Sequence, residues 1–195
     1  WIGNVFQGDL GRSFKYEDSV STIIVENMGI SFGIAFAALI LEFIIAIPLG
    51  VKAATNQYGV VDYSASVLSM IGTALPTFFF AAICIQLFSV QLGWFPVNGL
   101  TSTLPSDATE WTRFWDKIWH LVIPVFIMVF LSVGSLMRYT RTNTLEVLNA
   151  DYIRTARAKG LSEGKVIYKH AFRNTLIPLV TLLAGTLPGL FSGAM

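Results

Sequence analysis

The sequence contains few charged residues, and this scarcity excludes an ordinary soluble domain. Charged residues make up 13% of the 195 residues, against roughly 25% in soluble domains, whereas hydrophobic residues make up 54%. The net charge of +1 at pH 7 indicates neither a nucleic-acid partner nor an acidic one. The composition therefore predicts a membrane protein.

Groups that carry chemistry are also scarce. Cys84 is the one cysteine in the sequence, which excludes a disulfide framework and a cysteine metal cluster, and we expect it to be buried. We expect no set of Asp, Glu or His side chains to form a metal site with His120. The nearest approach to a phosphate-binding loop, GLSEGKV at 160–166, has three residues between its glycines instead of four and lacks the hydroxyl. We therefore expect no catalytic residue and no cofactor in this chain.

Long hydrophobic runs take the place of charge. Four segments approach the roughly 20 apolar residues that a spanning helix needs, at about 29–51, 64–90, 120–138 and 175–195. The prolines in these runs are tolerated in membrane helices. The sequence predicts an all-α, polytopic transmembrane helix bundle, with a loop over 1–28 and the transmembrane domain over 29–195. Because the last run stops at Met195, we expect the chain to be a fragment.

The basic residues indicate the orientation of these spans. Eight of the thirteen lie between the third and fourth runs: Arg138, Arg141, Arg154, Arg157, Lys159, Lys165, Lys169 and Arg173. The positive-inside rule places the 139–174 loop in the cytoplasm, and alternation then places the N-terminal loop outside.

The basic loop carries a helical pattern. Its first apolar stripe has spacings of three and four residues and consists of Leu145, Leu148, Tyr152 and Ala156. We predict one helix over this stripe with Gly160 as its C-terminal cap, and a second helix that begins with Ser162 as N-cap. The second stripe consists of Val166, Ile167 and Ala171. The loop is thus either a folded hairpin that docks a partner or a basic segment that fixes topology and contacts anionic lipid.

The run RTARAKGLSEGKVIYKHAFRN over 154–174 resembles the EAA loop of ABC importer permeases, in the version of the oligopeptide, dipeptide and nickel permeases. The general pattern is Glu-Ala-Ala, three residues, Gly, nine residues and Ile-x-Leu-Pro. Ala156 and Gly160 match it, whereas Arg154 and Thr155 replace Glu and the first Ala. His170, Phe172 and Arg173 replace Ile, Leu and Pro, a departure similar to the peptide branch. Similar segments are GDLGRSF at 8–14, IPLGVKAA at 47–54, LPTFF at 75–79 and HLVIP at 120–124.

This resemblance implies a type I ABC importer permease whose loop forms a coupling-helix hairpin in a groove of a cytoplasmic ATPase subunit. The implied coupling residues are Tyr152, Arg154, Thr155, Ala156, Arg157, Lys159, Gly160, Leu161 and Ser162. Tyr152 and Leu161 would be apolar anchors, and the basic side chains would pair with acidic ATPase residues or lipid headgroups.

The resemblance also implies the rest of the assembly. Its partners would be a second homologous permease, two ATPase subunits that hold ATP and Mg²⁺, an extracytoplasmic substrate-binding protein and membrane lipid, with no nucleic acid. The protein would be located in the inner membrane of a bacterium or archaeon, and its substrates would be short peptides. A nickel chelate or a glutathione-like ligand stays open as an alternative.

A few residues inside the spans invite a functional interpretation. Glu42 is expected to line a translocation path, to bond an adjacent helix, or to be neutral. Pro76 and Pro188 are expected either to bend helices around the path or to form static kinks. Small-residue spacings predict close helix packing at Gly29, Gly33, Gly185, Gly189 and Gly193.

Two other classes of protein compete with an importer permease. A secondary carrier or channel needs several intramembrane carboxylates or a selectivity ring, and Glu42 stands nearly alone. A membrane-anchored interaction protein would not need kinked spans rich in Gly and Pro. The lone carboxylate weighs against a carrier or channel, whereas the interaction protein stays open, with the kinked spans as the feature that discriminates it.

Overall fold

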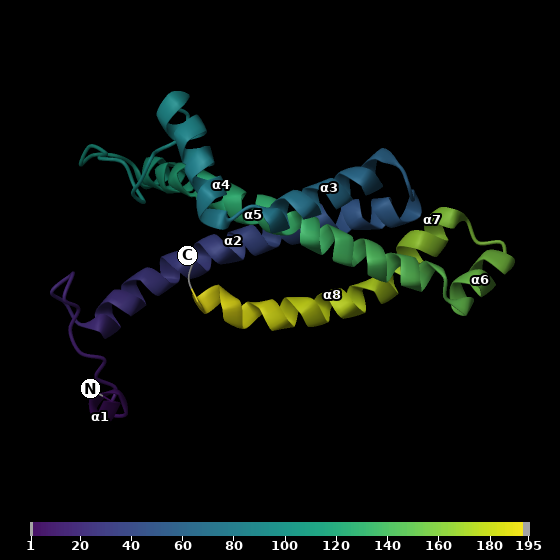
Figure 1. Cartoon of the computed structure of the whole chain (residues 1–195), viewed down its shortest axis with the longest axis horizontal. Coiled ribbons are helices and arrows are strands. Elements are labelled where there is room, and N and C mark those ends of the chain that lie inside the picture. Colours follow the sequence, from purple (N-terminus) through teal and green to yellow (C-terminus); the bar gives the residue numbers. More distant parts are fainter. Residues whose placement is uncertain (1, 193–195) are drawn as a thin grey trace.

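The computed structural model describes residues 2–192, and its long helices lie side by side (Figure 1). The elements are α1 (Ile2–Val5), α2 (Val20–Thr55), α3 (Val60–Ala74), α4 (Thr77–Cys84), the π-helix η1 (Ile85–Gln91), α5 (Glu110–Leu148), α6 (Asp151–Ala158), α7 (Glu163–Lys165), the π-helix η2 (Val166–Ala171), α8 (Phe172–Thr186) and the 3₁₀ helix η3 (Leu187–Ser192). Among residues 2–192, the β structure is limited to one isolated bridge between Arg12 and Ser19. The predicted all-α class is confirmed.

The two longest helices, α2 and α5, form the centre of the bundle. They contain 36 and 39 residues, which at 1.5 Å per residue is about 54 and 58 Å, well beyond a hydrocarbon core of roughly 30 Å. The prediction that residues 20–28 belong to the N-terminal loop is wrong, because the Ser19 hydroxyl accepts a bond from the Thr22 N–H (3.1 Å) and starts α2 there. Residues 139–148, expected in the cytoplasmic loop, are helical as the last turns of α5.

Within residues 2–192, three helices and one bent pair are apolar and long enough to cross a membrane. The helices are Val20–Thr55, Glu110–Leu148 and Glu163–Phe191, and the pair α3 and α4–η1 is bent by 103°. The bend follows from Pro76, because the residue before a proline avoids the helical region and Leu75 is extended (φ −86°, ψ 126°). The run at 64–90 is therefore two helical segments.

Small residues allow the central helices to pack closely. The core cluster contains four alanines beside larger side chains: Ala38, Ala46, Ala53, Ala65, Val129, Val133, Leu136, Met137 and Leu179. A methyl group added at Gly50 would come within 2.6 Å of Thr140 Cβ, and one at Gly134 would collide with the α3 backbone at Ser69. Gly50 and Gly134 are thus points of close helix approach.

The glycines expected at these contacts are different ones. A methyl group at Gly29, Gly33, Gly185 or Gly189 would meet nothing within 4 Å, and Gly193 lies outside the described residues. Close helix approach at the first four positions is therefore not seen among the described residues, and contacts there with helices outside them stay a prediction. Spacing alone identifies small residues that share a helix face but not whether a helix lies against that face.

Candidate functional site

The basic loop folds into a separate hairpin at one end of the bundle. Figure 1 shows α6 and α7 at the same end as the turn between α2 and α3, with the N-terminal segment and the loop after η1 toward the opposite end. Helix α5 leads directly into the hairpin, and η2 continues from it into α8. The hairpin is therefore joined to the bundle through two of the candidate spans.

The first apolar stripe of the loop is divided between two helices. Helix α5 ends at Leu148, and α6 starts after Ala150, whose backbone is extended (φ −69°, ψ 148°). The prediction of one helix from Leu145 to Ala156 is wrong. The chain turns at Asn149 and Ala150, and this turn brings Ile153 of α6, rather than Tyr152, into the interior.

Gly160 ends α6 as predicted. Its φ of +79° lies in the left-handed region, and its N–H donates to the Arg157 carbonyl (2.9 Å). Glycine adopts this conformation without the penalty that a Cβ imposes, so the position is a glycine C-cap. Ser162 has the extended backbone of an N-cap, but its side chain forms no capping hydrogen bond.

The hairpin has a small hydrophobic core of its own. Ile153, Ala156, Val166 and Ala171 are buried in it, and Val147, Leu148 and Leu161 pack against them. Of the two expected anchors, Tyr152 is 47% exposed, whereas Leu161 is partly buried inside the hairpin. Ala156 and Leu161 therefore stabilise the hairpin, and Tyr152 is left on its surface.

An ion pair closes the hairpin. The Arg157 guanidinium donates two hydrogen bonds to Glu163, from Nε to Oε2 (3.2 Å) and from Nη2 to Oε1 (2.7 Å). Hydrogen bonding to Glu163 raises the pKa of Arg157 above its ordinary value. Arg157, expected to pair with an ATPase residue or a lipid, is thus engaged within the chain. The other predicted polar residues are exposed: Arg154, Thr155, Lys159, Gly160 and Ser162.

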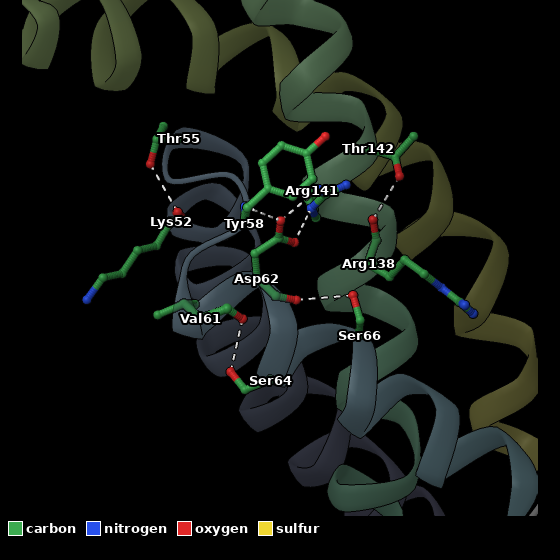
Figure 2. Close-up of polar contacts among 10 residues, drawn as sticks. All are labelled: Lys52, Thr55, Tyr58, Val61, Asp62, Ser64, Ser66, Arg138, Arg141 and Thr142. Atoms are coloured by element: carbon green, nitrogen blue, oxygen red, sulfur yellow. Dashed lines mark hydrogen bonds and ion pairs between the residues drawn. The ribbon is translucent and has the colours of Figure 1, made fainter.

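An ion pair with a buried carboxylate joins the start of α3 to α5 (Figure 2), toward the end of the bundle that the sequence predicts to be cytoplasmic. Asp62, at the start of α3, is 5% exposed and pairs with Arg141 of α5. Arg141 Nη2 donates to Asp62 Oδ2 (2.8 Å), Arg141 Nε lies against Oδ1, and the backbone N–H of Tyr58 donates to Oδ2 (2.9 Å). These contacts fasten the turn between α2 and α3 to α5.

Sequence reasoning missed the role of Asp62. The partners are 79 residues apart in the chain, and the sequence places Arg141 among basic residues that all look alike. A lone carboxylate in the short turn after the first span was the available signal. Identifying its partner requires the packing of α3 on α5.

The hairpin meets the bundle around an open pocket rather than a packed core. The pocket has a volume of about 350 Å³. It is lined by Ala54, Thr55 and Gln57 of the α2 end, Leu145, Leu148 and Asn149 of the α5 end, and Arg157, Glu163 and Ile167 of the hairpin. The end of α2 therefore faces the hairpin across this pocket, whereas α5 and α8 are joined to the hairpin through the chain itself.

A second pocket, of about 360 Å³, lies between α2, α4, α5 and the end of α8. Its lining consists of Ala35, Ala38, Leu39, Glu42, Thr77, Met128, Leu131, Ser132, Thr186, Gly189 and Leu190. Thr77 follows Pro76, and Thr186 and Gly189 flank Pro188. The structure therefore gathers Glu42 and the neighbours of both prolines around one cavity, although the prolines themselves do not line it.

The family comparison matches most of the chain. Residues 46–195 match the family described as "binding-protein-dependent transport system inner membrane component". The whole chain is 40% identical to the oligopeptide transport system permease protein AppB of Bacillus subtilis and covers 60% of it.

Two further relatives align over the whole chain. A putative peptide permease protein of Brucella suis is 35% identical and is covered over 60% of its length. The di/tripeptide transport system permease protein DppB of Pseudomonas aeruginosa is 34% identical and is covered over 62%. The chain thus spans about three fifths of the curated relatives it matches. With its membrane-spanning helices, it belongs to the family of binding-protein-dependent transport system inner membrane components.

Proposed function

We propose that this chain is the central part of a permease subunit in an ATP-driven importer, and that its hairpin docks a cytoplasmic ATPase subunit. The observation that carries this proposal is the hairpin itself, which folds around its own core and presents an exposed aromatic and basic surface. An exposed aromatic anchor surrounded by charges is the type of surface that supplies affinity and register in a protein groove. The EAA-loop resemblance and the family membership support the same role.

The complete assembly would contain the partners implied by the family. These are a second homologous permease, two ATPase subunits, an extracytoplasmic binding protein and surrounding lipid. ATP and Mg²⁺ would be bound by the ATPase subunits. In this assembly the hairpin transmits closure of the ATPases to α5 and α8, because both helices are continuous with it.

Short peptides are the proposed substrate class. The relatives named above are an oligopeptide permease, a putative peptide permease and a di/tripeptide permease. Glu42 and the helix breaks at Pro76 and Pro188 would line or shape the path. A secondary carrier or channel is disfavoured, because family members are named as parts of binding-protein-dependent systems.

The docking role can be tested with surface substitutions that leave the hairpin core intact. The full-length tagged protein is purified in mild detergent as wild type and as Tyr152→Ala/Arg154→Ala, and the accompanying proteins are identified by mass spectrometry. Both side chains are exposed, so the variant should fold and keep the second permease. We expect it to lose the ATPase subunits and peptide uptake.

A matched control separates docking from a general loss of aromatic surface. Tyr16 is 62% exposed in the N-terminal segment, at the end away from the hairpin in Figure 1. Tyr16→Ala should keep the ATPase subunits. Retention of the ATPases by the hairpin variant, at the level of this control, would refute the docking role.

The proposed orientation has an independent test. In a Cys84→Ser background, Ser162→Cys in the hairpin and Thr103→Cys in the loop after η1 are both exposed positions. A membrane-impermeant thiol reagent added to spheroplasts should label Thr103→Cys at once and Ser162→Cys only after lysis. The reverse order of labelling would contradict a cytoplasmic hairpin.

A further inference from the structure

The pocket around Glu42 opens to the surface of the bundle, and Glu42 itself lies near the middle of the span predicted at 29–51. Ala35, Leu39 and Ala46 share the Glu42 face of α2 and are buried, so this face is covered by protein. Glu42 is about 20 Å from the end of α2 at Thr55, at 1.5 Å per residue. In a hydrocarbon core of roughly 30 Å, this depth is far from both headgroup layers.

The polar atoms that line the pocket act mainly as hydrogen-bond acceptors. The Ser132 hydroxyl donates its one proton to the Met128 carbonyl (2.8 Å), and the Thr186 hydroxyl donates its proton to the Leu183 carbonyl (2.8 Å). Each hydroxyl therefore presents lone pairs to its surroundings. The Ser132 hydroxyl also forms a hydrogen bond with the Glu42 side chain, but its one proton is shared with the Met128 carbonyl, and an ionised carboxylate can only accept.

This arrangement leaves the Glu42 carboxylate without a positively charged donor among the described residues. Among residues 2–192, the ion pairs involve other acidic side chains, and none includes Glu42. A carboxylate in a membrane interior is costly unless a cation or a donor compensates it. Within the described residues the carboxylate is thus left to a proton or to a donor-rich cation that enters the pocket.

We propose that the pocket around Glu42 binds the primary ammonium group of the passing substrate. An ammonium group has three donors and no acceptor, which complements one carboxylate and the two hydroxyl lone pairs. Thr77, which also lines the pocket, supplies a further hydroxyl. This inference rests on the proposed function, in which the substrate is a short peptide, and it assigns the peptide's amino group to this pocket.

Other ligands fit the pocket less well. A divalent cation requires several carboxylate or imidazole ligands, and the described residues contain no group of three His, Cys, Asp or Glu that could hold one. The ammonium of a lipid headgroup belongs to the membrane surface, roughly 15 Å from the mid-plane. A peptide amino group, in contrast, is carried through the full depth of the membrane.

The first test asks whether the pocket is open to water and selects cations. Thr77→Cys is made in a Cys84→Ser background of the full transporter and reacted with two small methanethiosulfonates, one bearing an aminoethyl group and one a sulfonatoethyl group. Their rate ratio is normalised to the ratio with mercaptoethanol in solution. We expect a preference of about tenfold for the cationic reagent, which falls to about onefold when Glu42→Gln is added.

Two results of this test would overturn the inference. A rate ratio unchanged by Glu42→Gln would mean that the carboxylate does not attract cations into the pocket. The second result is that neither Thr77→Cys nor a separate Thr186→Cys variant reacts with either reagent. It would mean that another helix or lipid fills the pocket.

The second test identifies the ligand and separates this inference from the proposed function. Trialanine should protect Thr77→Cys from the cationic reagent, whereas N-acetyl-trialanine should not. Protection by N-acetyl-Ala-Lys-Ala would assign the pocket to a side-chain ammonium instead of the amino terminus. Equal protection by trialanine and its acetylated form would refute ammonium recognition.

If wild-type transporter takes up none of these peptides, the proposed function fails, and the peptide assignment fails with it. If uptake occurs without any charge preference at Thr77→Cys, the pocket inference alone fails.

Discussion

Removing one charge of the Asp62–Arg141 pair should destabilise the end of the bundle that carries the hairpin. Asp62→Asn keeps an acceptor for the Tyr58 N–H and removes only the charge, and Arg141→Gln removes the other charge. Breaking a fully buried pair costs about 3–5 kcal/mol, because one charge is left uncompensated. The Asp62 side chain is 7% exposed, but the Arg141 side chain is 26% exposed. Water therefore reaches the guanidinium, and we expect about 2–3 kcal/mol for each single substitution.

Cys84 provides a reporter for this measurement. It is 3% exposed and is the one cysteine in residues 1–195, so a thiol-reactive dye added during heating in detergent reports unfolding once any cysteine outside these residues is replaced by serine. The expected cost corresponds to a midpoint lowered by roughly 5–10 °C. Arg138→Gln is the matched control: Arg138 lies one turn before Arg141 on α5, is exposed, and points away from Asp62 in Figure 2.

The double variant decides whether the two residues act as a pair. Removing both charges leaves no uncompensated ion, so Asp62→Asn/Arg141→Gln should be destabilised by much less than the sum of the single effects. Additive effects would refute the reasoning. So would single variants that unfold at the same temperature as Arg138→Gln.

Three further predictions concern backbone contacts and the hairpin core. Gly134→Ala should lower the free energy of unfolding by about 1–3 kcal/mol, because its methyl group collides with the α3 backbone at Ser69. Gly185→Ala is the control: its methyl group meets nothing within 4 Å, so the thermal midpoint should be unchanged or raised. Tyr58 is exposed and has a φ of +60°, so Tyr58→Gly should stabilise the turn by up to about 1 kcal/mol, and a lowered midpoint would show that the ring has a contact in the assembly. Ile153→Ala should cost about 2–4 kcal/mol within the hairpin and speed trypsin cleavage at Arg157 and Lys159, whereas exposed Tyr152→Ala should leave the cleavage rate unchanged.

The sequence predicts the parts of this fold that depend on local chemistry. Apolar runs locate the spans, because a helix is the form in which an isolated segment satisfies its own backbone in lipid. Pro76 fixes the bend, since it excludes Leu75 from helical geometry. Gly160 fixes the end of α6 for a similar local reason, its positive φ. The ends of α2 and α5 are harder to predict from the sequence, because the part of a helix that lies outside the membrane has no sustained apolar run.

The contacts between helices could not be read from the sequence in the same way. The turn at Asn149–Ala150 moves Tyr152 outward and Ile153 inward, and no spacing rule contains that turn. Arg157 finds Glu163 six residues later, whereas Arg141 finds Asp62 across two helices. Tertiary proximity also selects which glycines lie at contacts, so Gly134 is enclosed while Gly33 is free of neighbours.

The position of Arg141 on α5 gives that helix the proportions of a lever. From Arg141 the helix continues about 10 Å to Leu148, where the hairpin begins, and about 46 Å in the other direction to Glu110, at 1.5 Å per residue. If α5 pivots at the Asp62–Arg141 ion pair, a 1 Å displacement at the hairpin moves the far end of the helix by about 4 Å. A small rotation imposed at the hairpin would thus be enlarged at the opposite end of α5.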